Sequence, residues 1–298
     1  TLTFDATGIS DQTASGTITL KLSPAGWSKA YSGTNLAAYK SPDVAATGCY
    51  LRIDDTSAKT ARAQGYESMT GISAGTGPFP TAAQLSGGVY WTKSSVADSS
   101  SRSWTLVADG RMFYLQTRYQ SGANGGGLVA FGDLVPLKSG DAWSCVLSGY
   151  FSDLSGSNPG ILDDYANNST TVGQLYLPRP YTGVGSAIWG QKGFGIPQPT
   201  SKASFASGSG PVKYPNGPDN GLYLSSHFVS DSADLSLRGV SPGLYCSPQL
   251  IPSGWASPHY SITGVSALPG RLIKVEPYGA ATGDLCGFAF FDVTGPWR

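Results

Sequence analysis

Charged side chains are scarce in this chain of 298 residues: they make up 13% of it, and the formal net charge is zero. Surfaces that bind nucleic acid or dock on anionic membranes need concentrated Lys and Arg. The chain also lacks a run of 18 apolar residues, which is roughly the shortest stretch read as a membrane-spanning helix. We therefore expect no nucleic-acid partner and no membrane insertion.

Metal-binding side chains are also few. The sequence contains only two histidines and two glutamates, and its four cysteines lie far apart, at Cys49, Cys145, Cys246 and Cys286. Because the chain has neither a C-x-x-C pair nor a His-rich cluster, we predict no metal site and no cofactor. Buried free thiols are the first interpretation of the cysteines, and one or two disulfides are the alternative.

A secretory signal is not visible at the start of the chain. Its first residues, TLTFDATGISDQTASG, have neither a basic region nor an apolar core. This observation leaves open a signal that has already been removed.

Turn formers are what the sequence has in abundance, with 40 glycines and 20 prolines. This composition favours an all-β fold with long loops. The clearest element is Ser103–Tyr119, in which two apolar, aromatic-rich runs flank Asp109-Gly110. Asp-Gly is typical of a tight type I′ turn, which needs a positive φ. Because Met112–Leu115 has apolar side chains on both faces, we predict a central β-hairpin that is covered on two sides.

Further strands are expected on both sides of this hairpin. Residues 61–70 fit either a strand or a short helix, and residues 71–80 look irregular because they contain three glycines and two prolines. Residues 151–220 are rich in proline and glycine and read as a long excursion rather than as packed strands. The other expected strands are 17–22, 49–54, 89–91, 128–135, 142–147, 222–229, 235–238, 243–246, 272–276 and 288–293.

The predicted fold is therefore all-β, with antiparallel sandwich or barrel-like modules and long Gly/Pro-rich loops. We divide the chain into an N-terminal β domain at 1–150, the Gly/Pro-rich excursion at 151–220 and a C-terminal β region at 221–298. The C-terminal region can pack with the first domain.

Two segments match the G-x-S-x-G pattern of a nucleophile elbow, and their central serines are Ser73 and Ser241. The elbow needs a strand before the serine and a helix after it. The prolines after Ser73 prevent such a helix, and Pro242 has no backbone N–H for an oxyanion hole. His227 reads as a buried structural histidine and His259 as a loop residue. We assign no catalytic residue and expect that the protein is not an enzyme.

Carbohydrate chemistry has weaker signals. The adjacent carboxylates Asp54-Asp55 and Asp163-Asp164 read as turn-forming or solvated groups rather than as the opposed pair of a glycosidase. Loop aromatics offer rings for sugar stacking, but such rings equally anchor loops or fill subunit interfaces. The candidates are Trp27, Trp189, Trp255 and Tyr181.

Several segments together resemble a group of uncharacterised virion or tail-region proteins of tailed bacteriophages and prophages of Gram-negative bacteria. These segments lie at 22–35, 50–56, 75–84, 102–115, 131–148, 237–245 and 292–298, and they include RSWTLVADGRMFYL, LRGVSPGLY and DVTGPWR. The resemblance does not extend over residues 152–220, and it brings no catalytic motif with it.

The resemblance implies a multi-copy structural component of a virion, in the tail or baseplate, whose partners are other virion proteins and copies of itself. It also implies assembly in the reducing bacterial cytoplasm, which agrees with unpaired cysteines. A capsid decoration protein and a carbohydrate-binding adhesin that recognises a host surface glycan are the alternatives. We expect the excursion at 151–220 to contact neighbouring subunits.

Overall fold

The fold is known from a computed structural model, which describes residues 12–14, 27–41, 43–93, 102–118, 126–150, 173–194, 221–233, 236–246, 261–262, 273–277, 288–292 and 297. Almost all regular structure in these ranges is antiparallel β-strand. The one described helix, α1 (Ala82–Leu85), is a single turn with a capping box between Thr81 and Gln84. No helix in the described part of the chain is long and apolar enough to cross a membrane. The predicted all-β fold is confirmed.

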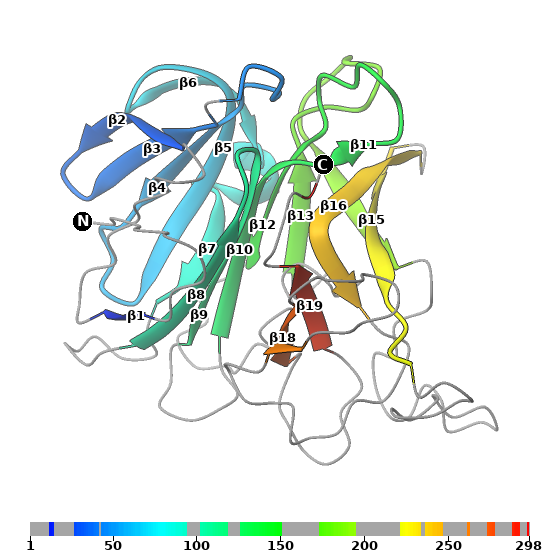
Figure 1. Cartoon of the computed structure of the whole chain (residues 1–298). Helices are drawn as coiled ribbons and strands as arrows, with labels where there is room; N and C mark the ends of the chain where they lie inside the picture. Colours follow the sequence, from blue (N-terminus) through cyan, green and yellow to red (C-terminus); the bar gives the residue numbers. More distant parts are fainter. Residues whose placement is uncertain are drawn as a thin grey trace.

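The strands form three layers that lie side by side in Figure 1. The first layer, blue to cyan, pairs β2 to β3, β3 to β4 and β4 to β5, and the other edge of β5 pairs with β6 and β7. Its strands are β2 (Ser28–Gly33), β3 (Leu36–Lys40), β4 (Tyr50–Asp54), β5 (Thr60–Gly71), β6 (Ala74–Phe79) and β7 (Val89–Thr92).

The central layer is built on the hairpin of β8 and β9. Its order is β1, β8, β9, β10 and β12, and the pair Tyr150–Tyr90 joins β12 to β7 of the first layer. The strands are β1 (Gln12–Ala14), β8 (Arg102–Ala108), β9 (Met112–Arg118), β10 (Gly126–Asp133) and β12 (Cys145–Tyr150).

From β12 the sheet continues through β13 and β14 into the third layer. There β14 pairs with β15, β15 with β16, and β16 with both β11 and β19. The strands are β11 (Val135–Pro136), β13 (Gly173–Leu177), β14 (Ile188–Phe194), β15 (Ser225–Asp231), β16 (Leu237–Cys246), β17 (Ser261–Ile262), β18 (Ile273–Pro277) and β19 (Phe288–Asp292). Strand β18 pairs with both β17 and β19.

Both faces of the central layer are buried. Phe113 and Leu115 of β9 pack in a core shared with the first layer, whereas Met112 and Tyr114 pack in a second core shared with the third layer. All four side chains are at most 1% exposed. Each large apolar side chain that is removed from water in this way contributes roughly 1.5–3 kcal/mol. The predicted hairpin, covered on two sides, is therefore confirmed.

The turn of this hairpin differs from the predicted type I′ turn. Gly110 is not among the described glycines with a positive φ. Instead, the Asp109 carboxylate accepts hydrogen bonds from the backbone N–H groups of Arg111 (2.8 Å) and Met112 (2.6 Å). An Asp side chain that bonds to the backbone ahead of it closes a turn without a left-handed residue.

Two other expectations change in the first layer. Residues 60–71 form one long strand, which decides between the strand and the helix in favour of the strand. Residues 71–80 are not irregular, because most of them form β6, which pairs with β5. Glycine is needed there for space: a Cβ at Gly75 would lie 2.5 Å from the Tyr66 ring.

The described part of the 151–220 excursion corrects the expectation that this stretch lacks packed strands. Strand β13 lies between β12 and β14, and its Tyr176 is fully buried. Strand β14 continues the sheet to β15. Residues 151–172 and 195–220 lie outside the described residues, as does the strand expected at 17–22.

Replacing Asp109 with Ala is predicted to destabilise the fold by about 1–3 kcal/mol, because two backbone donors lose a charged acceptor. Asp109→Asn keeps the Oδ1 acceptor and should cost less. Gly110→Val should change the free energy of unfolding by less than about 0.5 kcal/mol, since Gly110 has no left-handed backbone. Denaturant unfolding measures all three variants; a loss of about 1–2 kcal/mol in Gly110→Val would instead indicate a positive φ.

Candidate functional site

His227 and Ser241, which are separate candidates in the sequence, come together in the third layer. His227 Nδ1 lies 2.7 Å from Ser241 Oγ, and the two residues are 0% and 1% exposed. They face each other across an irregularity between β15 and β16, where the register moves from Ser226–Tyr245 to Phe228–Val240.

The G-V-S-P-G sequence around Ser241 therefore forms a bulge, not a nucleophile elbow. The Tyr114 hydroxyl donates a hydrogen bond to the Pro242 carbonyl (2.9 Å). Gly243 has a φ of +68°, and a Cβ there would lie 2.3 Å from the Trp297 ring. The bulge lets the second half of β16 pair with β19. Ser241 is shielded from solvent, and Pro242 has no N–H for an oxyanion hole. We therefore interpret the His227–Ser241 contact as a structural one that holds the bulge of β16 against β15.

The remaining polar candidates are not gathered into one site. Ser73 lies in the tight turn between β5 and β6. Asp54 accepts hydrogen bonds from the N–H and hydroxyl of Thr56, and Asp55 forms an ion pair with Lys93. Among the described residues, no group of three or more His, Cys, Asp or Glu side chains is placed to hold a metal ion. His259 and Asp163-Asp164 lie outside the described residues.

Trp27 is not an exposed ring for sugar stacking. It is 6% exposed and packs edge-on against Phe113 and Phe131 of the central layer. Its indole N–H donates a hydrogen bond to the Asp109 carbonyl (2.8 Å). Trp27 thus anchors the hairpin turn to the first layer. Trp255 lies outside the described residues.

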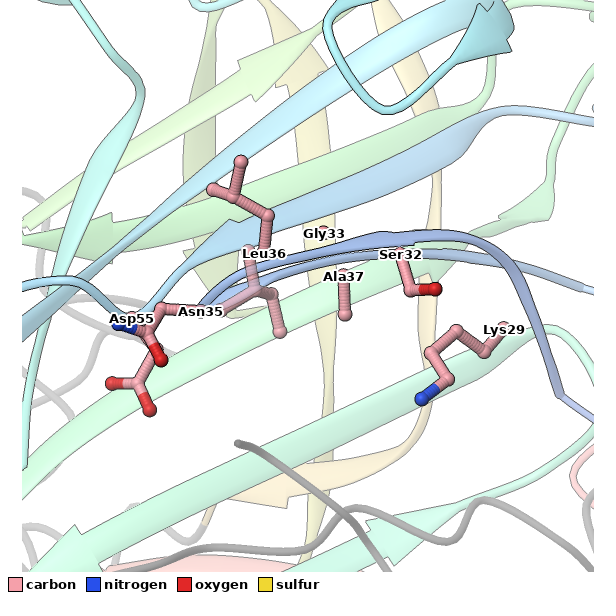
Figure 2. Close-up of a pocket in the computed structure, with 8 residues that line it drawn as sticks. Lys29, Ser32, Gly33, Asn35, Leu36, Ala37 and Asp55 are labelled. Carbon is pink, nitrogen blue, oxygen red and sulfur yellow. The ribbon is translucent and has the colours of Figure 1, made fainter.

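A small cavity lies beside the hairpin of β2 and β3 (Figure 2). It encloses about 340 Å³, including space open to solvent, and Lys29, Asn35 and Asp55 are among the residues that line it. Asp55 is already paired with Lys93. The cavity is partly open to solvent, whereas a specific ligand site surrounds most of its ligand.

The 137–144 loop, the 178–187 loop and the start of β16 lie together at the upper right in Figure 1, and several of their side chains are apolar and exposed. Seven large hydrophobic residues are exposed in the described part of the chain, and five of them lie on the loops and strand ends found here. We call this surface the loop end and define it by Leu137, Tyr181, Val184, Trp189 and Leu237.

Backbone and ring contacts hold the segments of the loop end together. The Leu137 N–H bonds to the Arg238 carbonyl (3.1 Å), and the Ser232 N–H bonds to the Trp189 carbonyl (3.1 Å). The Lys138 ammonium lies 4.6 Å from the centre of the Tyr181 ring. These contacts connect the 137–144 loop to β16 and to the 178–187 loop, and they connect β14 to the turn after β15.

The guanidinium of Arg238 is buried among the segments of the loop end and is 1% exposed. It pairs with both oxygens of Asp141 (2.8 and 3.0 Å) and with Asp231 (3.2 Å). It also donates to the carbonyls of Arg179 (2.9 Å) and Trp143 (3.1 Å). These five bonds match the five N–H donors of an arginine, so one side chain ties together the 137–144 loop, the 178–187 loop and the turn after β15.

A second ion pair extends this scaffold to the first layer. Arg179 binds the Glu67 carboxylate through two nitrogens (2.7 and 2.8 Å), and the hydrogen bond with Glu67 raises the pKa of Arg179. The same guanidinium lies over the Trp143 ring, 4.7 Å from its centre. The loop end is consequently braced against β5.

Comparison with known proteins adds no assignment. No family model matches the chain, and no curated protein matches it. Tyr181 and Trp189 of the loop end are candidates from the sequence, whereas Leu137, Val184 and Leu237 are not. Their exposure depends on where the loops lie, and no local pattern in the sequence signals it.

Arg238→Met is predicted to destabilise the protein by about 3–5 kcal/mol, because it leaves Asp141 and Asp231 buried without their cation. The matched control is Arg179→Met. That pair is partly exposed, so its loss should destabilise the protein much less than the loss of Arg238 does. Denaturant unfolding compares the two variants. Equal losses would contradict the account of Arg238 as the buried tie of the loop end.

Proposed function

We propose that this chain is a structural subunit of a tailed bacteriophage particle, located in the tail or baseplate, and that it acts through protein–protein contacts. The phage context comes from the sequence resemblance, and the mode of action comes from the loop end. The observation that carries the second part is that five exposed apolar side chains belong to segments that Arg238 and Arg179 hold in place.

The chemistry of the loop end suits contact with another protein subunit. Aromatic and large aliphatic side chains at the centre of an interface supply most of its binding energy. The nearby guanidinium groups already have their counterions, because Arg179 pairs with Glu67 and Arg238 pairs with Asp141 and Asp231. A partner can cover the surface without stripping water from an unpaired arginine.

Glycan binding by an adhesin is the second candidate, supported by the half-exposed rings of Tyr181 and Trp189. However, Lys138 lies against the Tyr181 ring, and the Trp189 ring packs at 4.7 Å from Tyr176. These contacts take up part of each ring that a sugar would need. The leucine and valine side chains beside them favour a protein partner. A capsid decoration protein would use the same kind of contact at another place on the particle.

The first test is to purify particles of the phage or prophage that encodes the chain and to quantify its peptides by mass spectrometry. The proposal predicts many copies in each particle and their presence in isolated tails. Recovery only from the unassembled fraction of the lysate would overturn it, and recovery from tail-free capsids would support the decoration role instead.

The double variant Leu137→Lys/Leu237→Lys is predicted to unfold at the same denaturant midpoint as the unchanged protein, because both side chains are more than half exposed. Its incorporation into particles should fall at least about tenfold, since burying the exposed halves of two leucines contributes roughly 1.5–3 kcal/mol. Val44→Lys, which changes a fully exposed residue in the loop between β3 and β4, is the control. Normal incorporation of the double variant would show that the loop end is not the contact surface.

A further inference from the structure

Cys49 and Cys145 come from different layers but share one buried site. Cys49 precedes β4 of the first layer, and Cys145 begins β12 of the central layer. Both belong to the core between these layers, and they are 5% and 1% exposed. Both are free thiols, and the neighbouring Cys49 thiol is one cause of the raised pKa of the Cys145 thiol.

Neighbouring polar contacts hold the two thiols in place. Thr47 donates its backbone N–H and its hydroxyl to the two oxygens of Asp133, at 2.7 and 2.6 Å. Asp133 is the cross-strand partner of Cys145 in the ladder of β10 and β12. Because Thr47 is two residues from Cys49, these bonds fix the loop that carries Cys49 against the start of β12.

From this placement we propose that Cys49 and Cys145 form a site of reversible oxidation, at which a small-molecule disulfide converts the two thiols to an intramolecular disulfide. The new bond would join the loop after β3 to β12 and so link the first layer covalently to the central layer. The inference concerns these two residues alone and does not depend on the proposed function.

The reaction is an ordinary thiol–disulfide exchange in two steps. The Cys49 thiolate attacks one sulfur of oxidised glutathione and releases one glutathione thiolate. The Cys145 thiolate then attacks the Cys49 sulfur of the mixed disulfide and releases the second. Two protein thiols are oxidised, one glutathione disulfide is reduced to two glutathione molecules, and the two protons pass from the protein thiols to the glutathione thiolates.

Burial makes this exchange slow. Removal from water, the hydrogen bond with Cys49 and the nearby Asp133 charge raise the pKa of the Cys145 thiol well above its usual range. The thiolate is the attacking species, so the rate should increase with pH across the neutral and mildly alkaline range. Because both thiols are buried, the oxidant can reach them only when the structure around them opens.

The test incubates the folded protein with oxidised glutathione at pH 7 and pH 9, blocks remaining thiols in denaturant and maps the tryptic peptides without reduction. Peptide 41–52, which contains Cys49, should appear linked to the peptide that contains Cys145. Linkage should form faster at pH 9. The unfolding midpoint of the oxidised protein should be higher by on the order of 5 °C and should return to its starting value with reductant.

Two controls make the assignment specific. Cys145→Ser should lose both the linked peptide and the increase in midpoint. Oxidation of the protein in denaturant should scatter the linkages among all four cysteines. If the folded protein yields no Cys49–Cys145 peptide, or yields it no more often than the denatured protein does, the proposed site is wrong.

Discussion

The constraint on which the structure depends is that the central hairpin must be buried on both faces. Met112, Phe113, Tyr114 and Leu115 are consecutive large apolar residues, so neither face of β9 can be left in water. One covering layer would bury only Phe113 and Leu115, and a second is needed for Met112 and Tyr114. The three-layer architecture follows from this pattern, and the sheet supplies the third layer by continuing from β12 through β13 and β14.

The central layer also positions the loop end. Strand β10 continues through Leu134 into β11, which pairs with β16 at Val135–Val240, so the 137–144 loop starts from a fixed point. Arg238 then binds three segments in one buried network, and Arg179 with Glu67 braces the same region against the first layer. The apolar side chains above are therefore presented by an ordered scaffold. Little conformational entropy would be lost when a partner covers them.

The sequence predicts the parts of the fold that follow from local alternation. Alternating apolar residues indicate which face of a strand is buried. This pattern locates the hairpin of β8 and β9, strand β7, and strand β4 with its buried Leu51 and Ile53. Strand β6 cannot be predicted in this way. Its glycines leave space for Tyr66 and Glu67 of β5, and this contact is visible only once the two strands are paired. The type of the turn at Asp109 cannot be predicted from Asp-Gly alone. Here the carboxylate of Asp109 accepts the backbone hydrogen bonds that close the turn.

The candidate site was less accessible to prediction than the fold. His227 and Ser241 lie on neighbouring strands and meet only because β16 bulges. Trp27 is predicted to lie in a loop, but in the fold it is buried between two layers. Leu137 and Leu237 are ordinary leucines in sequence. Their exposure depends on where the 137–144 loop and the start of β16 lie, and the Leu137–Arg238 backbone hydrogen bond and the buried Arg238 side chain connect these segments.

Hydroxyl-radical footprinting, read by mass spectrometry, tests the central claim most directly because it reports the solvent exposure of individual side chains. In the isolated subunit, Leu137, Tyr181, Trp189 and Leu237 should label strongly. In assembled particles they should be protected, while Val44 should label alike in both. Equal labelling of the four loop-end residues in the subunit and the particle would contradict the account.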